Sequence, residues 1–151
     1  MSAHNIESLK EILPDYAKDI RLNLSNVIKE DPHSGLTLAQ VYGIALASAY
    51  ATKNAPVIAA ILGEVSSMLS AEEVSAAKAA ATIMAMNNVY YRSAYMTQDD
   101  ELNKMPAGLR MNVIGNPGVD KITFELYSLG VSAINGCGAC VQSHSNAVQH
   151  S

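Results

Sequence analysis

Three features that would mark common protein classes are missing from this 151-residue sequence. It has no run of lysine and arginine, and its formal net charge is −4, so neither nucleic acid nor an anionic membrane surface is an expected partner. The longest apolar stretches, such as residues 55–62, are too short to span a bilayer. The first residues do not combine a basic segment with an apolar one, so no secretory signal is predicted.

Cysteine is also scarce, since Cys137 and Cys140 are the only two. For a chain with two cysteines and no export signal we expect a reducing compartment, and we predict a cytoplasmic location. In such a compartment a close cysteine pair is more often redox-active or metal-binding than a structural disulfide. The pair is therefore the first candidate for chemistry.

Strand patterns are absent as well, because no segment alternates apolar and polar residues and none is dense in valine, isoleucine and threonine. Helix signals recur instead. Thr37 with Gln40, and Ser70 with Glu73, form capping-box patterns in front of helical segments. We predict an all-α fold that forms one domain over residues 1–151.

The expected helices follow from caps, prolines and apolar periodicity. They run from Asn5 to Leu13, from Pro14 to about Glu30 with an apolar stripe at Ile20, Leu24, Val27 and Ile28, from Thr37 to about Thr52, from Pro56 to about Gly63, from Ser70 to Tyr95, from Asp120 to Asn135 and from Gly138 to Gln149. A long irregular connection is predicted over residues 97–120. Segments 40–48 and 125–133 share a hydrophobic pattern, which favours two related helical hairpins.

One predicted helix is rich in tyrosine and methionine. We interpret these side chains as a core or subunit-interface stripe, which is commoner than a ligand pocket. They are Met84, Met86, Tyr90, Tyr91, Tyr95 and Met96.

The segment from 136 to 150 concentrates the candidate chemistry. On a helix, Cys140 and His144 stand four positions apart, and Cys137 and His144 stand seven apart. These spacings predict that the three side chains project from one helix face.

A single carboxylate, Glu125, is the only formally charged side chain from residue 122 to the end. An isolated carboxylate in an apolar helix is costly to bury unless it is paired or protonated. We expect Glu125 to pair with the thiols or with His144 across a turn at Gly136, where glycine can end one helix.

A thiol at a helix N-terminus is a known route to a reactive thiolate. The helix dipole and the Cys-x-x-Cys arrangement lower a cysteine pKa from about 8.5 to roughly 3.5–7.5. Such a thiolate can attack a peroxide and become a sulfenic acid, which the second thiol condenses to a disulfide. The leaving alkoxide needs a proton, and Glu125 and His144 are the groups that could pass it. By the dipole argument alone, Cys137 is favoured as the more acidic thiol because it lies nearer the helix start.

These residues carry a family resemblance. Glu125, Cys137, Cys140 and His144, separated by eleven, two and three residues, resemble the motif of the alkylhydroperoxidase D (AhpD) group of the carboxymuconolactone decarboxylase superfamily. The preceding segments are similar to that family too, namely Gly108–Asn112, Asn116–Gly118, Phe124–Leu126 and Val131–Gly136. The resemblance extends over the whole chain.

The resemblance implies a helical fold and an antioxidant peroxidase, an alkyl hydroperoxide reductase with a redox-active Cys137–Cys140 disulfide. It assigns the peroxidatic role and the sulfenic acid to Cys140, and the roles of proton donor and resolving thiol to Cys137. Glu125 and His144 are implied as the proton relay, with no metal at the site.

The resemblance also implies partners. They are organic hydroperoxides, a peroxiredoxin that the protein reduces, and a lipoyl-bearing protein with its dehydrogenase as the electron source, with no bound cofactor. A homo-oligomer, favoured as a trimer, is expected. Ala139 stands where some members have a histidine, and members usually continue with a further helix after the position of Ser151, so we expect that helix to be absent or shortened.

Two other function classes remain open from the residues. One is a thiol-disulfide transfer protein without peroxidase activity. The other is a non-catalytic helical oligomer or zinc-binding module, in which the two cysteines, His144 and Glu125 would supply the ligands.

Overall fold

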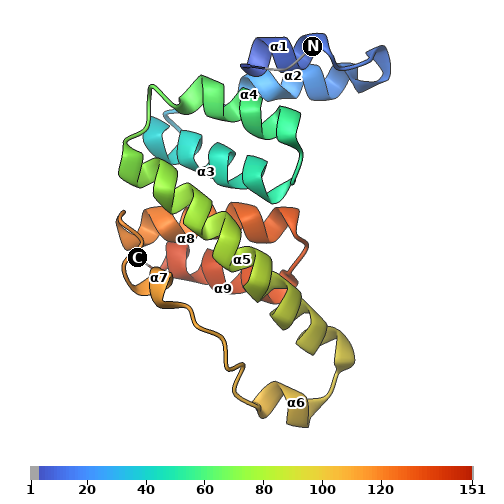
Figure 1. Cartoon of the computed structure of the whole chain (residues 1–151), viewed down its shortest axis with the longest axis vertical. Coiled ribbons are helices and arrows are strands. Elements are labelled where there is room, and N and C mark those ends of the chain that lie inside the picture. Colours follow the sequence, from blue (N-terminus) through green and yellow to red (C-terminus); the bar gives the residue numbers. More distant parts are fainter. Residues whose placement is uncertain (1–3, 151) are drawn as a thin grey trace.

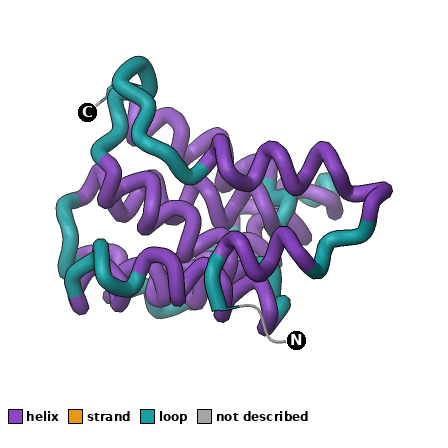
Figure 2. The backbone as a smooth tube through the Cα atoms, turned by 90° about the horizontal axis from the view of Figure 1, so that it is seen from above, coloured by secondary structure: helices purple, strands orange, loops and turns teal. Residues whose placement is uncertain are grey.

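The computed structural model describes residues 4–150, and within that range every regular element is helical, with no strand (Figures 1 and 2). The all-α prediction is therefore confirmed. The elements are α1 (Ile6–Glu11), a 3₁₀ turn η1 (Asp15–Ala17), α2 (Lys18–Val27), α3 (Leu38–Ala51), α4 (Ala55–Val65), α5 (Ala71–Thr97), α6 (Asp100–Lys104), α7 (Asn112–Gly115), α8 (Lys121–Ile134) and α9 (Gly138–Gln149).

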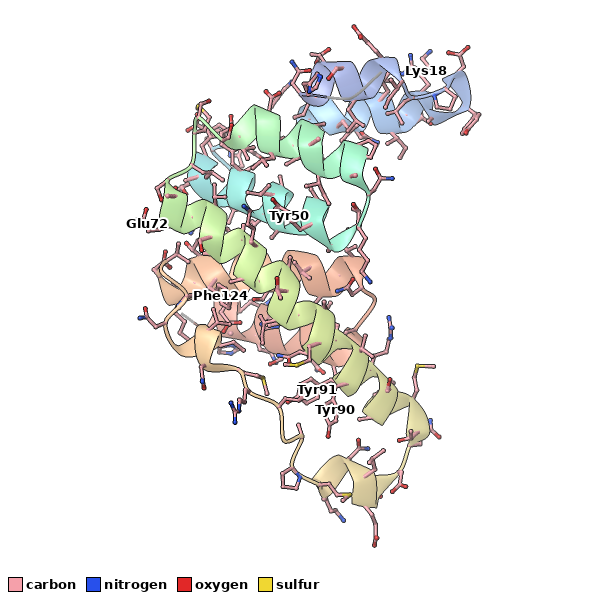
Figure 3. The ribbon with its side chains drawn as sticks, in the orientation of Figure 1. Lys18, Tyr50, Glu72, Tyr90, Tyr91 and Phe124 are labelled. Carbon is pink, nitrogen blue, oxygen red and sulfur yellow. A yellow bond between two sulfur atoms is a disulfide. The ribbon has the colours of Figure 1, made fainter. Side chains whose placement is uncertain are left out.

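Helices α3, α5, α8 and α9 form the centre of the molecule, and α5 runs across the other three (Figure 1). Helices α1 and α2 lie beyond α4 at one end, while α6 lies at the other. The core between these helices contains Leu46, Met84, Phe124, Tyr127 and Val131, all almost inaccessible to solvent. Figure 3 shows Phe124 on α8 within this packed region.

The predicted caps define where most of the central helices begin. Thr37 accepts from the backbone N–H of Gln40, and Ser70 accepts from that of Glu73; both capping boxes are complete. Asp120 caps α8 in the same way, through the backbone N–H of Thr123. Each cap satisfies donors that a helix N-terminus leaves free. The predictions for α3, α5 and α8 are confirmed to within a few residues.

The second predicted helix differs from the structure. Pro14 precedes the turn η1 rather than an α-helix, and α2 ends at Val27. Its expected apolar stripe is only partly buried, because Ile20 and Val27 are 58% and 66% exposed. Leu24 and Ile28 do pack against the core, so only one side of the stripe finds a partner.

The connection predicted as irregular over residues 97–120 contains two short helices, α6 and α7. Asp99 starts α6 by accepting from two backbone N–H groups, those of Glu101 and Leu102. Asp99 is therefore the N-cap of α6.

Helices α3 and α8 pack against each other and each is followed by a second helix, α4 or α9 (Figure 1). This is the arrangement that the similarity of segments 40–48 and 125–133 predicts. The side-chain amide of Gln40 donates to Thr123 Oγ1 at 3.0 Å between the two hairpins. At Gly43 the ring of Tyr127 lies so close that no methyl group would fit.

In the part of the chain that the structure describes, no helix is both long and apolar enough to cross a membrane.

Candidate redox site

The turn between α8 and α9 places the cysteine pair. Gly136 adopts a positive φ of 69°, in the left-handed region where glycine is the least strained residue. The next residue, Cys137, is the N-cap of α9, and its Sγ accepts from the backbone N–H of Cys140 at 3.3 Å. Cys137 and Cys140 form a disulfide, with their Cα atoms 5.3 Å apart.

The two cysteines differ in what they contact. Cys137 is completely buried, whereas Cys140 is 6% exposed and borders a cavity of about 360 Å³. Cys137 is not among the residues that line this cavity. A small molecule in the cavity would therefore meet Cys140 first.

Three parts of the chain enclose the cavity. Helix α5, the segment around α7, and α9 supply its walls. Tyr91 projects from α5 on the side of the segment that leads to α7 (Figure 3). The complete lining is Met84, Asn87, Tyr91, Met111, Ile114, Ala139, Cys140, Ser143 and His144. The wall is mainly apolar, with Cys140 and His144 as its reactive groups.

Glu125 pairs with His144, which is one of the two kinds of partner expected for it, the other being the thiols. Oε2 of Glu125 lies 2.6 Å from Nδ1 of His144, and each side chain is 15% exposed. The close packing of α8 on α9 brings the two side chains together across the hairpin. A hydrogen bond of this length between partly buried groups is strong and directional. The pair is placed to hold and exchange a proton.

The second nitrogen of His144 contacts a residue that the sequence did not single out for the site. Nε2 lies 3.3 Å from Sδ of Met84, which is 1% exposed. Met84 belongs to the stripe interpreted as core or interface, and it is a core residue, but it and Tyr91 also line the cavity. Tyr95 and Met96, at the far end of the same stripe, are each 73% exposed.

A partly buried polar network holds the turn in place. The side-chain amide of Asn88 on α5 donates to Ser132 Oγ at 2.9 Å, and its carbonyl accepts from the amide of Asn135 at 3.0 Å. Arg92 donates to the backbone carbonyl of Asn135. Buried networks of this kind fix a single geometry because each unmade bond is costly. This one fixes the chain immediately before Cys137.

Two ionisable groups on or next to α8 are shifted by their surroundings. Hydrogen bonds from Thr123 hold the pKa of Asp120 below its usual 3.8. Burial raises the pKa of Tyr127 to about 12, with smaller contributions from the negative charges of Glu73 and Asp120. Asp120 is the N-cap of α8 and Tyr127 lies within α8, the helix that carries Glu125. The charge states of both groups therefore affect the stability of that helix.

The predicted site residues thus come together, with one refinement. Cys140 and His144 share the face that borders the cavity, while Cys137 lies behind Cys140 at the helix start. Asn87 and Met111 also line the cavity but are not predicted from the sequence as site residues. Nδ2 of Asn87 donates a hydrogen bond to Sδ of Met111 at 3.2 Å. They are 24 residues apart, and no local pattern connects them.

A larger apolar cavity of about 630 Å³ lies elsewhere, between α2, α3 and α4. No cysteine or histidine lines it. By volume alone this cavity would be the better candidate for a ligand site, but the reactive groups Cys140 and His144 line the smaller cavity. For the zinc alternative, no set of three or more histidine, cysteine and acidic side chains within residues 4–150 is placed to hold a metal ion.

Comparisons with known proteins find relatives that match most of this chain. Residues 100–150 match the model of the carboxymuconolactone decarboxylase family. An alkyl hydroperoxide reductase AhpD of Coxiella burnetii is 52% identical over 143 residues, covering 95% of this chain and 81% of the relative. The AhpD of Rhodospirillum centenum is 53% identical over 146 residues, covering 97% and 77%. That of Rhodopseudomonas palustris is 55% identical over 139 residues, covering 92% and 75%.

Proposed function

We propose that this chain, which belongs to the AhpD group of the carboxymuconolactone decarboxylase family, is a dithiol alkyl hydroperoxide reductase. The observation that carries the proposal is the position of Cys140. It borders a cavity that also contains His144, and His144 is hydrogen-bonded to Glu125. A nucleophile, a substrate-sized space and a proton-carrying pair therefore meet at one place.

In the proposed reaction the Cys140 thiolate attacks the outer oxygen of a hydroperoxide. The O–O bond breaks, Cys140 becomes a sulfenic acid, and the alkoxide takes a proton to leave as an alcohol. The Cys137 thiol then attacks the sulfenic sulfur, which releases water and forms the disulfide. Peroxide is reduced by two electrons and the dithiol is oxidised by two.

The different burial of the two sulfurs supports this division of roles. Because Cys140 reaches the cavity and Cys137 does not, Cys140 is the better candidate for the attack. Cys137 is within bonding distance of Cys140, as resolution of the sulfenic acid requires. The helix dipole favours Cys137 as the more acidic thiol, but for a peroxide the access of Cys140 to the cavity outweighs this effect.

We assign the proton relay to Glu125 and His144. The alkoxide released from an alkyl hydroperoxide is a strong base, so a positioned acid accelerates its departure, typically by about 10²–10⁴-fold. The hydrogen bond between the two side chains lets a proton given up at His144 be replaced from Glu125.

The disulfide must be reduced again for turnover, which takes two electrons and two protons. We propose a dihydrolipoyl group on a carrier protein, served by its dehydrogenase, as the source, and a peroxiredoxin as a further recipient of electrons. Such a cycle fits a cytoplasmic location, where reductants are abundant.

We further propose that the protein is a homo-oligomer, with a trimer favoured. Exposed apolar side chains around the end of α5 support a subunit interface there, since surface apolar clusters commonly mark contacts. They are Val89, Tyr91, Tyr95, Met96, Leu102 and Met105. Light scattering coupled to size exclusion measures the subunit number, and a monomer at micromolar concentration contradicts the proposal.

The test of the two roles is a pair of serine variants, each reduced and then treated with one equivalent of cumene hydroperoxide. In Cys137→Ser, Cys140 should accumulate as a sulfenic acid that dimedone traps. In Cys140→Ser, the remaining buried thiol should react far more slowly. Trapping at Cys137 in the second variant, at a rate like that of Cys140, contradicts the assignment.

A thiol-disulfide transfer protein is the competing function, and it predicts a different pattern. Its dithiol would reduce a lipoyl or glutathione disulfide quickly while cumene hydroperoxide leaves both thiols intact. That combination of rates would replace the peroxidase proposal.

A further inference from the structure

The contact between His144 and Met84 constrains where the histidine carries its protons. A thioether sulfur has no hydrogen and can only accept, and it is a weak acceptor. With Nε2 of His144 3.3 Å from Sδ of Met84, a hydrogen bond forms only when Nε2 is protonated. Met84 is 1% exposed and packs in the core, so its sulfur is held at this position.

The other nitrogen has a partner that suits both protonation states. Nδ1 lies 2.6 Å from Oε2 of Glu125, which can accept a proton as a carboxylate or donate one as a carboxylic acid. The mobile proton of the pair therefore lies between Nδ1 and Oε2. Until a substrate oxygen enters the cavity, the proton on Nε2 is shared only with the weak sulfur acceptor of Met84.

We propose that Met84 is a positioning residue that fixes His144 with Nε2 protonated. This N–H, and not the Cys137 thiol that the family resemblance implies, is then the donor to the leaving alkoxide, because His144 lines the cavity and Cys137 does not. The inference rests on the proposed peroxidase function and specifies its proton-donating atom. Both Met84 and His144 line the cavity beside Cys140, so a substrate oxygen can take the N–H from the weaker sulfur acceptor.

The proton transfer balances within these groups. Before the reaction, Nε2 carries one proton and the Nδ1–Oε2 pair carries another. When Nε2 gives its proton to the alkoxide, Nδ1 keeps or receives the second proton. His144 then is neutral with Nδ1 protonated, and Glu125 is a carboxylate. One proton has left Nε2, the Nδ1–Oε2 pair has kept its own, and one alcohol has formed.

A sulfur acceptor fits this task better than an oxygen would. A carboxylate or carbonyl in the place of Met84 would hold the N–H too strongly to release it, since charged and carbonyl acceptors form stronger bonds. Leucine has almost the same volume but would leave Nε2 without an acceptor. The neutral ring could then carry its proton on either nitrogen.

The chain offers a matched control. Met111 lines the same cavity with its own thioether, but its sulfur accepts from Asn87 Nδ2 at 3.2 Å and not from His144. Met84→Leu and Met111→Leu therefore make the same chemical change at two walls of one cavity. Only the first removes the acceptor of Nε2.

The first readout is the ring ¹⁵N spectrum of His144, assigned with His144→Gln. In the reduced wild type and in Met111→Leu, the spectrum should show Nε2 protonated. In Met84→Leu the fraction of His144 rings with Nε2 protonated should fall. A wild-type ring with an unprotonated Nε2 overturns the proposal, whatever the variants do.

The second readout is the rate at which Cys140 reacts. Toward cumene hydroperoxide, Met84→Leu should be about three- to tenfold slower than the wild type, the size expected for one modest hydrogen bond. Toward iodoacetamide, whose leaving iodide needs no proton, the two rates should be equal. Equal slowing with both reagents indicates structural damage and refutes the positioning role.

The peroxidase function and the role of Met84 can be refuted separately. A wild type that does not consume cumene hydroperoxide refutes the peroxidase function, while the ¹⁵N spectrum still decides the protonation of His144. A wild type that does consume it, with Met84→Leu as fast, refutes the role of Met84 alone.

Discussion

Alanine at Gly43 should destabilise the protein, because the Tyr127 ring occupies the space that its methyl group needs. A Cβ at Gly43 would overlap Oη and Cζ of Tyr127. The ring is fully buried between α3 and α8, so it cannot swing into solvent. Either the ring or one of the two helices must move.

The magnitude follows from two opposing effects. Overpacking of a well-packed core costs about 1–3 kcal/mol, and a clash with a rigid ring belongs at the upper end of that range. Alanine regains about 1 kcal/mol of helix propensity over glycine. The expected net loss is therefore about 2 kcal/mol, which lowers Tm by roughly 4–8 °C for a chain of this size.

Urea and thermal unfolding followed by circular dichroism measure the loss. Gly130→Ala is the matched control: its Cβ would lie 3.0 Å from Ser48 Oγ and 3.2 Å from Ile44 Cγ2, so these side chains need to shift by only a few tenths of an ångström. Its stability should stay near that of the wild type. Combining Gly43→Ala with Tyr127→Leu should recover part of the Gly43→Ala loss. An unchanged Tm for Gly43→Ala, or strictly additive losses in the double variant, refutes the explanation.

Three other predictions concern α8. Glu125→Gln keeps a hydrogen-bonding side chain beside His144 but cannot supply a proton, so peroxide reduction should fall about 10²-fold while alkylation of Cys140 by iodoacetamide changes little; equal losses in both rates count against the relay. Asp120→Ala should cost about 1 kcal/mol of stability at pH 7 by removing the N-cap of α8. The pKa of Asp120 is lowered in the folded state. The part of the stability difference between wild type and Asp120→Ala that depends on the charge of Asp120 is therefore present above pH 3.8, the usual pKa, and should shrink as the pH falls through the lowered pKa. Acid unfolding curves of the two proteins measure this. The raised pKa of Tyr127 has the opposite consequence: its contribution to stability is fully present below pH 10 and is lost as the pH rises through about 12. Tyr127→Phe should abolish this loss and cost little at pH 7, since the buried hydroxyl has no hydrogen-bond partner within residues 4–150.

Much of the fold could be predicted from local signals. Thr37, Ser70 and Asp120 start their helices by accepting from backbone N–H groups a few residues ahead, so the cause of each start lies beside it in the sequence. Gly136 ends its helix for an equally local reason, the conformational freedom that a positive φ needs. The second helix was predicted less well, because exposure of Ile20 and Val27 depends on what packs against them.

In the candidate site, too, the features with a local cause could be predicted from the sequence and the contacts between distant segments could not. The spacing of Cys137, Cys140 and His144 is local, and the isolated charge of Glu125 indicated that it needs a partner. Met84 could not be connected to His144 from sequence, because the two are 60 residues apart and meet only when α5 packs on α9. Its periodic position predicted burial correctly, but burial does not reveal which atom the sulfur contacts.

The polar network around Asn88 was invisible for a similar reason. Its partners Ser132 and Asn135 lie 44 and 47 residues away on another helix and its turn. A buried asparagine in a mainly apolar helix is nevertheless a usable signal, since such a group must find hydrogen-bond partners. For Asn88, those partners hold the turn that carries the cysteine pair.

The most direct test of the peroxidase account is a single-turnover measurement on the reduced wild-type protein. One equivalent of cumene hydroperoxide is added, free thiols are counted, and the peptide holding Cys137 and Cys140 is weighed by mass spectrometry. The account predicts the loss of two thiols and of two hydrogens per chain, with one equivalent of the alcohol formed. Two thiols that remain free, with the peroxide unconsumed, would contradict it.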